Sequence, residues 1–166
     1  MQVSHDCLDA FGLKIVSDDL NTRMKAKLWA SSAHLWNADI RVGVIGHCMV
    51  CEVGPEVEFY LASHLKPLLP NSSKLLIQHY LWHPLSGISA HSDASYKFGA
   101  TIYLSENWQI NDGGIFLWRE RDSQQLKCIE PTYNTMVVNN EREQHWVTCV
   151  SPLAKKPRVT LQIWGI

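Results

Sequence analysis

The second half of this sequence consists of short apolar runs separated by residues that favour turns. From Lys74 onward, the runs are rich in β-branched and aromatic side chains. This alternation is typical of an antiparallel β sandwich or barrel. The predicted strands span residues 75–82, 98–104, 115–118, 126–129, 135–138, 146–150 and 158–164. Turns are expected at residues 84–87, 111–114, 131–134, 139–140 and 152–157, where Gly, Pro or Asn occurs.

The first part of the chain favours helices instead. Residues 17–36 are predicted to form an amphipathic helix, because apolar residues repeat at helical spacing after polar residues that can cap a helix. The apolar residues are Leu20, Met24, Leu28 and Leu35, and the polar ones are Ser17, Asp18 and Asp19. A second helix is predicted for residues 55–66, with proline in its first turn and two prolines after its end. Its apolar face contains Val57, Leu61 and Leu65.

The size and composition fit one globular domain. The chain has 166 residues, of which 46% are hydrophobic and 19% are charged, and domains commonly contain about 100 to 150 residues. We expect a single domain over residues 1–166, with a helical N-terminal part at about 1–70 and a β core at about 74–166. The formal net charge of -1 gives no bulk attraction to nucleic acids or acidic membranes.

The sequence predicts a cytoplasmic protein with reduced thiols. Residues 1–16 lack a basic start followed by an apolar run, and no stretch approaches the ~20 apolar residues that cross a bilayer. The five cysteines are an odd number, which disfavours a disulfide framework. Cys48 and Cys51 form a Cys-x-x-Cys pair that could be half of a zinc site or a redox pair. A structural role is favoured because no second close pair accompanies them.

Three residues of this sequence suit a metal ion. His91 and Asp93 are separated by one residue, and in a β-strand such side chains leave the same face, so both can point at one ion. His145 lies where a polar stretch gives way to a predicted strand, and a rolled-up β fold can bring it to the same place. Two imidazoles and one carboxylate on one face of an octahedral ion leave the opposite positions open, as in non-heme Fe(II) oxygenases.

Each of these residues alone also has an ordinary structural explanation. A His-x-Asp tripeptide occurs by chance in a chain with eight histidines. His145 alone would be a hydrogen-bonded histidine of the core or its rim, and Arg158 alone would be an exposed cation. The order of these residues along the predicted strands is what favours a functional site.

A longer series of motifs resembles the prolyl-hydroxylase-like branch of the Fe(II)/2-oxoglutarate-dependent dioxygenases. The resemblance covers about residues 75–164, and the motifs occur in that family's order. They are Tyr80 on the strand leading to His91-Ser92-Asp93, the strand Ala100-Thr101-Ile102-Tyr103-Leu104-Ser105 with Asn107-Trp108, then Asp112-Gly113-Gly114, Glu130-Pro131, His145 and Arg158-Val159-Thr160-Leu161-Gln162-Ile163-Trp164. The series is specific, whereas any single member is not.

The resemblance implies a mainly β fold, namely a double-stranded β-helix (jelly roll, cupin-like) with the N-terminal helices packed on one sheet. Strand alternation agrees with it: an inward Arg158 places Thr160 and Gln162 on the inner face. An inward Tyr103 does the same for Thr101. The residues that would then point outward are Phe98, Ala100, Ile102, Val159, Leu161 and Ile163. This apolar outer face needs the cover that amphipathic helices provide.

The resemblance also implies roles for the site residues. His91, Asp93 and His145 would hold Fe(II) and form the catalytic centre. Arg158 would pair with the distal carboxylate of 2-oxoglutarate, for which its planar charged fork is better suited than a lysine ammonium. The residues expected to bind the cosubstrate with it are Tyr103, Thr101, Thr160 and Tyr80.

By the same resemblance, the cofactors are Fe(II), the cosubstrate 2-oxoglutarate and O2, with ascorbate as an optional supporting reductant. The expected reaction hydroxylates an aliphatic C–H bond and releases succinate and CO2. We expect the substrate to be an amino-acid side chain, prolyl first, either free, carrier-bound or within a peptide. The expected substrate contacts are Trp82 and Lys97, which stands where family members often carry an arginine before the tyrosine strand.

Three other functions fit the sequence less well. A zinc protease would need His79 and His83 on a helix with an intervening glutamate, which is absent. Nucleic-acid demethylation by the same fold is disfavoured because the strand after Arg158 has no second arginine and the charge is balanced. A catalytically silent jelly-roll module that binds metal would have no use for Arg158 beside three metal ligands.

Overall fold

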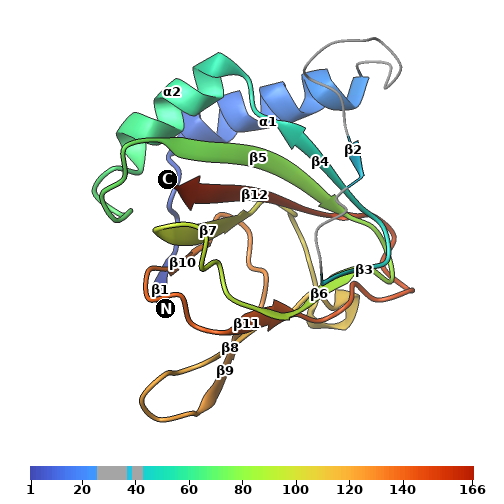
Figure 1. Ribbon diagram of the computed structural model, residues 1–166. Helices are drawn as coiled ribbons and strands as arrows, with labels where there is room; N and C mark the ends of the chain where they lie inside the picture. The colour runs from blue at the N-terminus through green and yellow to red at the C-terminus, as the bar shows by residue number, and fades with distance from the viewer. Residues whose placement is uncertain (26–36, 39–42) are drawn as a thin grey trace.

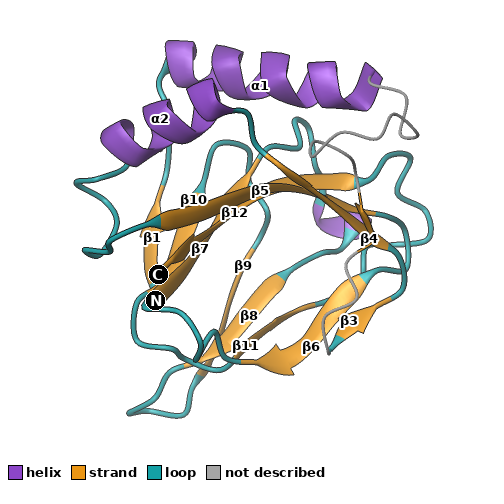
Figure 2. Ribbon diagram, turned by 45° about the horizontal axis from the view of Figure 1, so that its top comes forward, coloured by secondary structure: helices purple, strands orange, loops and turns teal. Residues whose placement is uncertain are grey.

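Two antiparallel sheets face each other, and two helices cover the outer side of the larger sheet (Figure 1, Figure 2). The computed structural model describes residues 1–25, 37–38 and 43–166. The larger sheet has the order β1 (Gln2–Ser4), β10 (Met136–Asn139), β7 (Phe98–Tyr103), β12 (Arg158–Gly165), β5 (Leu75–Trp82), β4 (Cys48–Glu52) and β2 (Asn37–Ala38). The smaller sheet has the order β3 (Val44–Ile45), β6 (Gly87–His91), β11 (His145–Val147), β8 (Phe116–Arg119) and β9 (Leu126–Ile129). This arrangement is the predicted double-stranded β-helix, or jelly roll.

The strands predicted for the C-terminal half are confirmed, with small shifts at their ends. The strands β1 to β4 were not predicted, and of β6 only a strand at His91 was expected, without bounds. The predicted turn at residues 84–87 already contains the first residue of β6. The N-terminal strands are short and pair with distant segments, since β1 pairs with β10 and β4 pairs with β5. Residues 1–70 therefore contribute strands to both sheets as well as helices.

The predicted alternation along β7 and β12 is confirmed. The outer core combines residues of these strands with residues of α1 (Ala10–Lys25) and α2 (Pro55–His64). Its members include Phe98, Ala100, Ile102, Leu161 and Ile163 from the strands, and Val16, Val57 and Leu61 from the helices. Tyr103 belongs instead to the inner core between the two sheets. The apolar outer face of the larger sheet is thus what the helical layer covers.

The predicted second helix is confirmed, whereas the predicted start of the first helix is wrong. α2 begins at Pro55 as predicted and ends at His64. α1 begins at Ala10, because the Asp9 carboxylate accepts a hydrogen bond from the Gly12 backbone N–H at 2.7 Å and caps the helix there. Residues 26–36 of the predicted helix lie outside the described residues. No helix in the described part of the chain is long and apolar enough to cross a membrane.

Asp19 was predicted to cap a helix, but it joins α1 to the larger sheet. Its Oδ2 accepts hydrogen bonds from Arg23 Nε at 2.9 Å and from His79 Nε2 at 2.8 Å. The backbone N–H of Gly54 donates to the same oxygen at 3.2 Å. Burial would raise the pKa of Asp19, but the hydrogen bonds from His79 and Arg23 outweigh burial and lower it.

Replacing Asp19 with alanine is expected to lower the free energy of unfolding by about 2 kcal/mol, because Arg23 and His79 lose a shared acceptor in a buried setting. The loss should be full above the ordinary carboxyl pKa of about 3.9 and should shrink progressively as the pH falls from there toward the lowered pKa of the folded state. Urea unfolding at neutral and acid pH would measure both effects. Asp18→Ala, which removes an exposed ion pair with Lys14, is the matched control; an equal loss in both variants would contradict the assignment.

Cys48 and Cys51 point to opposite faces of β4. Cys48 belongs to the inner core with Tyr80, whereas Cys51 packs with Leu81 on the outer face. Residues three positions apart on a strand must leave opposite faces. The two thiols therefore point away from each other, which disfavours a shared ion or a disulfide between them, and the structural role favoured by the sequence stays a prediction.

Candidate active site

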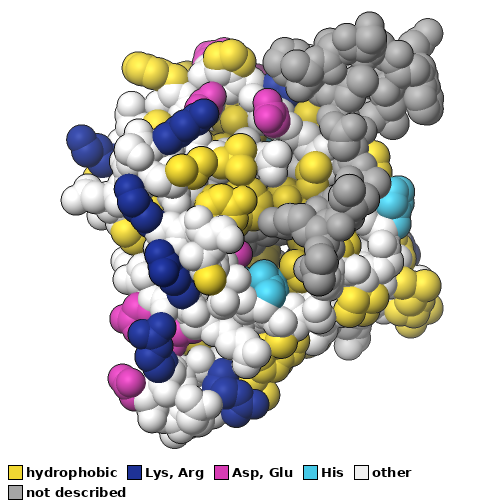
Figure 3. Space-filling model, viewed as in Figure 1, with side chains coloured by type: hydrophobic (Ala, Val, Ile, Leu, Met, Phe, Trp, Pro, Cys, Tyr) yellow, Lys and Arg dark blue, Asp and Glu magenta, His cyan; other side chains and the backbone are white. Residues whose placement is uncertain are grey.

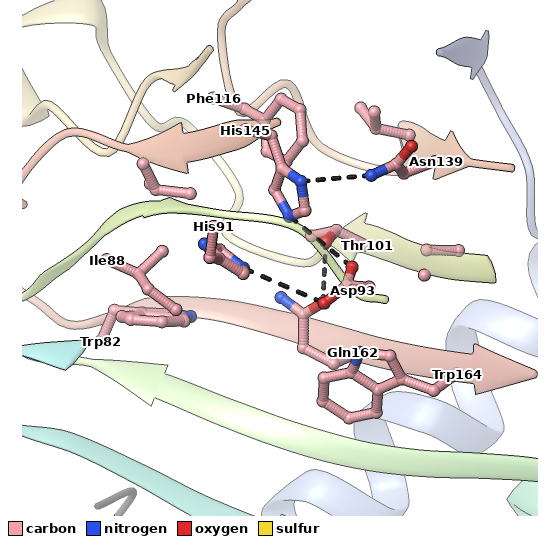
Figure 4. Close-up of a pocket in the computed structure, with 14 residues that line it drawn as sticks. Trp82, Ile88, His91, Asp93, Thr101, Phe116, Asn139, His145, Gln162 and Trp164 are labelled. Carbon is pink, nitrogen blue, oxygen red and sulfur yellow. Dashed lines mark hydrogen bonds and ion pairs between the residues drawn. The ribbon is translucent and has the colours of Figure 1, made fainter. Parts of the chain in front are cut away.

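His91, Asp93 and His145 meet between the two sheets (Figure 4). Their candidate ligand atoms all lie within 4.8 Å of one another. Asp93 Oδ1 is 3.9 Å from His91 Nε2, and Asp93 Oδ2 is 3.6 Å from His145 Nε2. His91 and His145 are direct partners in the pairing of β6 with β11. The sheet register thus brings together two residues that are far apart in the sequence.

Asp93 reaches this centre from a loop. The sequence analysis expected His91 and Asp93 on one strand, but β6 ends at His91, so this part of the prediction is wrong. The Asp93 carbonyl accepts a hydrogen bond from the Tyr96 N–H at 2.9 Å, which closes a turn after the ligand. The Asp93 side chain then packs over Gly99 on β7, where a Cβ atom would lie 2.2 Å from Oδ2. Gly99 therefore leaves the space that the carboxylate occupies.

Both imidazoles present their Nε2 atoms to this centre. His91 Nδ1 lies 2.8 Å from the Ser89 carbonyl, and His145 Nδ1 lies 3.0 Å from the Glu143 carbonyl. A carbonyl oxygen only accepts hydrogen bonds, so each Nδ1 carries the hydrogen and each Nε2 keeps a lone pair. Burial, together with the neighbouring His91, lowers the pKa of His145 and favours its neutral form. Both rings therefore suit coordination of a metal ion through Nε2.

Asn139 supports His145 and was not identified from the sequence, where it was read only as a turn residue. Its Nδ2 donates to the Glu143 carbonyl and its Oδ1 accepts from the Glu143 N–H, both at 2.9 Å. Asn139 Nδ2 also lies 3.2 Å from His145 Nδ1 (Figure 4). The buried amide thus fixes the carbonyl that orients the imidazole.

Replacing Asn139 with alanine is expected to weaken binding of a divalent metal about tenfold, because the Glu143 carbonyl would lose its anchor while all three ligands remain. Titration with Co(II), followed by its visible spectrum, would measure this change. The adjacent exposed Asn140 offers a control. Equal Co(II) affinities in Asn139→Ala and Asn140→Ala would show that Asn139 has no part in orienting His145.

Arg158 lies at 1% exposure and has no carboxylate partner among the described residues. Its Nη1 donates to the Gly114 carbonyl at 2.5 Å, while its Nε lacks a hydrogen-bond partner in the described structure. The buried Tyr103 hydroxyl lacks one too. Burial lowers the pKa of Arg158 and raises that of Tyr103, because burial disfavours the charged form of each side chain. A buried cation beside a free hydroxyl is the donor set that a carboxylate ligand would satisfy.

Trp82 separates the Arg158 guanidinium from the cavity that contains the three candidate metal ligands. Trp82 and Thr101 line the cavity, together with Gln162 and Trp164. The Thr101 hydroxyl donates to Gln162 Oε1 at 2.7 Å. The sequence placed Gln162 on the inner face but did not assign it to the site.

The other predicted cosubstrate residues lie on the far side of Trp82 and do not line this cavity. They are Arg158, Tyr103, Thr160 and Tyr80. The Arg158 guanidinium carbon lies 5.3 Å from the centre of the Trp82 ring. Trp82 Nε1 donates to the Thr160 hydroxyl at 3.2 Å, and the Tyr80 ring stacks on Trp82 at 5.7 Å. Lys97, predicted to contact substrate, is exposed and donates to the Ile166 carbonyl at 3.2 Å outside the cavity.

Comparisons with known proteins agree with this fold. The family model of the 2OG-Fe(II) oxygenase superfamily matches residues 75–165. No curated protein matches the chain. Among solved structures, a Pseudomonas putida prolyl-4-hydroxylase is 17% identical with a TM-score of 0.74, over 99% of this chain and 90% of that one. A Trichoplax adhaerens prolyl hydroxylase, in complex with a hypoxia inducible factor oxygen degradation domain peptide fragment, is 16% identical with a TM-score of 0.73, over 99% and 82%.

A third similar structure is that of HygX from Streptomyces hygroscopicus with nickel, 2-oxoglutarate and hygromycin B bound. It is 12% identical with a TM-score of 0.66, over 98% of this chain and 81% of that one. At these identities the solved structures show a shared fold. The family model covers more than half of the chain and includes His91, Asp93, His145 and Arg158. The chain therefore belongs to the 2OG-Fe(II) oxygenase superfamily and is a dioxygenase that uses Fe(II), 2-oxoglutarate and O2.

Proposed function

We propose that this dioxygenase hydroxylates an aliphatic C–H bond of an amino-acid side chain, prolyl first, in a peptidyl or small-molecule substrate. His91, Asp93 and His145 would hold Fe(II), and Arg158 and Tyr103 would bind the distal carboxylate of 2-oxoglutarate. The observation that carries this proposal is a buried arginine and a buried hydroxyl that lack partners in the described structure, behind a cluster of two histidines and an aspartate. When bound, Fe(II) with 2-oxoglutarate and O2 supplies the oxidation, in which one oxygen atom enters succinate and the other enters the substrate.

The chain's own residues would bind and orient the reactants. The Ser89 and Glu143 carbonyls hold the two imidazoles with Nε2 toward the metal. Three ligands on one face leave positions for cosubstrate and O2. Phe116 stacks on His145 with the ring centres 5.2 Å apart, so an apolar ring covers one face of this imidazole. Thr101 and Thr160 already have partners, Gln162 and Trp82, so we assign them the lesser role of shaping the site.

An amino-acid side chain as substrate is supported by the shape of the open side. The side chain of His91 is 28% exposed, against 8% for His145, so the centre opens toward the loop that carries Asp93. A second depression along this loop adjoins the centre and is lined by residues 91–96 and Ile88. A side chain that projects from a peptide could enter here. The peptide complex of the Trichoplax adhaerens hydroxylase supports a peptide substrate. HygX has hygromycin B bound, so a small-molecule substrate remains an alternative.

Anaerobic addition of Fe(II) and 2-oxoglutarate tests the site. The proposal predicts a weak visible charge-transfer band that requires both components and disappears in Asp93→Ala. A missing band in well-folded protein, or an unchanged band in Asp93→Ala, would favour a silent metal-binding module instead.

Succinate release across a panel of amino acids, peptides and nucleic acids tests the substrate. We expect stimulation by prolyl compounds or other compounds with aliphatic amino-acid side chains. If only nucleic acid stimulates succinate release, the substrate assignment is wrong, whereas the assignment of the metal and cosubstrate sites is unaffected.

A further inference from the structure

Five cations form a stripe along one edge of the molecule, which we call the basic stripe. It consists of Lys66, Lys74, Lys97, Arg121 and Arg142, which the contacts described below connect. Figure 3 shows Lys and Arg side chains gathered in a column along one edge of the face it presents. The whole chain has a formal net charge of -1. Acidic side chains lie beside the lower part of this column in the same view, so the column is a local excess of positive charge that the bulk composition does not reveal.

Backbone and side-chain contacts connect the upper part of the stripe. Lys66 and Lys74 line one surface depression between α2 and β5. The Lys74 carbonyl accepts a hydrogen bond from the Ile166 N–H at 2.9 Å, and the Ile166 carbonyl accepts one from Lys97 Nζ at 3.2 Å. The path thus runs from the helical layer to the start of β7.

The lower part of the stripe follows the loop that carries Asp93. Arg142 Nε donates to the Tyr96 carbonyl at 3.1 Å, and Tyr96 N–H in turn donates to the Asp93 carbonyl. Arg121 Nη2 donates to the Glu141 carbonyl at 2.6 Å, next to Arg142 in the chain. Lys97 and Arg142 therefore flank the open side of the proposed metal centre from two different loops.

The charges of the stripe have no acidic side chain as a partner within the described part of the chain. No Asp or Glu carboxylate there lies within 4.0 Å of the charged nitrogens of these five residues, whereas Lys14 and Lys127 each have an acidic partner. Lys97 Nζ donates to the backbone oxygen of Ile166, the last residue of the sequence, at 3.2 Å. Glu58 shares the depression with Lys66, and Glu141 lies beside Arg142, but neither forms an ion pair with the stripe. The Arg142 and Arg121 side chains bond only backbone carbonyls, which leaves their charge available to an anion.

We infer that the basic stripe binds an acidic segment of a peptide substrate, which holds the residue to be oxidised at the open side of the metal centre. This inference rests on the proposed function and names its substrate class more closely. A stripe of one sign beside an open site steers oppositely charged partners and fixes their register. Nucleic acid is the less fitting partner, because unpaired bases need aromatic platforms. Among the described residues, the strongly exposed aromatic side chains are Phe11 and Phe59, which belong to the helical layer.

The experiment uses three labelled peptides of equal length with a central proline, flanked by glutamates, by glutamines or by lysines. Fluorescence anisotropy measures their binding to protein loaded with Ni(II) and 2-oxoglutarate, in which no turnover occurs. We expect the glutamate peptide to bind about tenfold more tightly than the glutamine peptide at low salt, and this advantage to shrink as salt screens exposed charges.

Lys97→Glu with Arg142→Glu is the test variant, and Lys155→Glu with Lys156→Glu is the matched control. Lys97 pairs with the end of β12 and the control lysines precede its start, so Lys97 and the control pair lie at opposite ends of one strand. The test variant should lose about tenfold in affinity for the glutamate peptide, and the control should stay within about twofold. Melting curves of both variants establish that they are folded.

Equal or undetectable binding of the glutamate and glutamine peptides overturns the inference. It is also overturned if the preference survives in the test variant, or if single-stranded RNA binds more tightly than the glutamate peptide. The proposed function fails separately: a protein that prefers the acidic peptide but gives no charge-transfer band with Fe(II) and 2-oxoglutarate has the binding stripe without the proposed chemistry.

Discussion

Replacing Arg158 with alanine is expected to weaken binding of 2-oxoglutarate by about two to three orders of magnitude, because removing one partner of a buried, hydrogen-bonded charge pair costs about 2–5 kcal/mol. Arg158 is the buried guanidinium without a carboxylate partner in the described structure, and it lies 5.9 Å from the Tyr103 ring. Titration of the Fe(II) protein with 2-oxoglutarate under anaerobic conditions would measure the change. An unaltered 2-oxoglutarate affinity in Arg158→Ala would place the cosubstrate elsewhere.

Two further variants separate charge, shape and stability at this position. Arg158→Lys keeps the charge but lacks the planar fork, so we expect an intermediate loss of affinity. Arg158→Met keeps apolar volume and removes a buried, unpaired charge, so the protein without cosubstrate should be as stable as the original or more stable. Loss of 2-oxoglutarate binding without loss of stability would show that the arginine is retained for its ligand.

The parts of the fold that periodicity determines were predictable from the sequence. Alternation along residues 158–164 places Arg158 and Thr160 inward and Leu161 outward, and the structure agrees. The residues that form the candidate metal centre were predictable because their order along the chain, among the other motifs, resembles that of a known family. Each residue alone also had an ordinary structural explanation, so the whole series carried most of the information about the centre.

Features that depend on long-range partners were not predictable. β1 and β4 are short and acquire strand structure through pairing with β10 and β5. α1 begins early because Asp9 caps it, and Gly12 is tolerated in a helix because it packs directly against Tyr60. Asn139 supports His145 through backbone groups of Glu143, which no side-chain pattern reveals.

Gly99 illustrates how a backbone position can determine metal binding. It lies on β7 and is not a ligand, yet a Cβ atom there would come within 2.2 Å of Asp93 Oδ2. We expect Gly99→Ala to displace the Asp93 carboxylate and to weaken binding of Co(II) by more than the ~100-fold that losing an outer-shell partner can cost. The atoms in conflict belong to a side chain on a loop, so the loop can move while the sheet remains intact.

A double-mutant cycle with Asp93 separates this effect from general strain in β7. In the Asp93→Ala background the clash is absent, so Gly99→Ala should change neither the residual Co(II) affinity nor the melting temperature appreciably. Ser92→Ala, at an exposed neighbouring position, controls for changes in the loop itself. If Gly99→Ala destabilises the protein equally with and without the Asp93 carboxylate, β7 requires glycine for its own packing. If Gly99→Ala loses the metal only when the Asp93 carboxylate is present, Gly99 is required here by the space that this ligand needs, and the strand beneath the carboxylate sets its position.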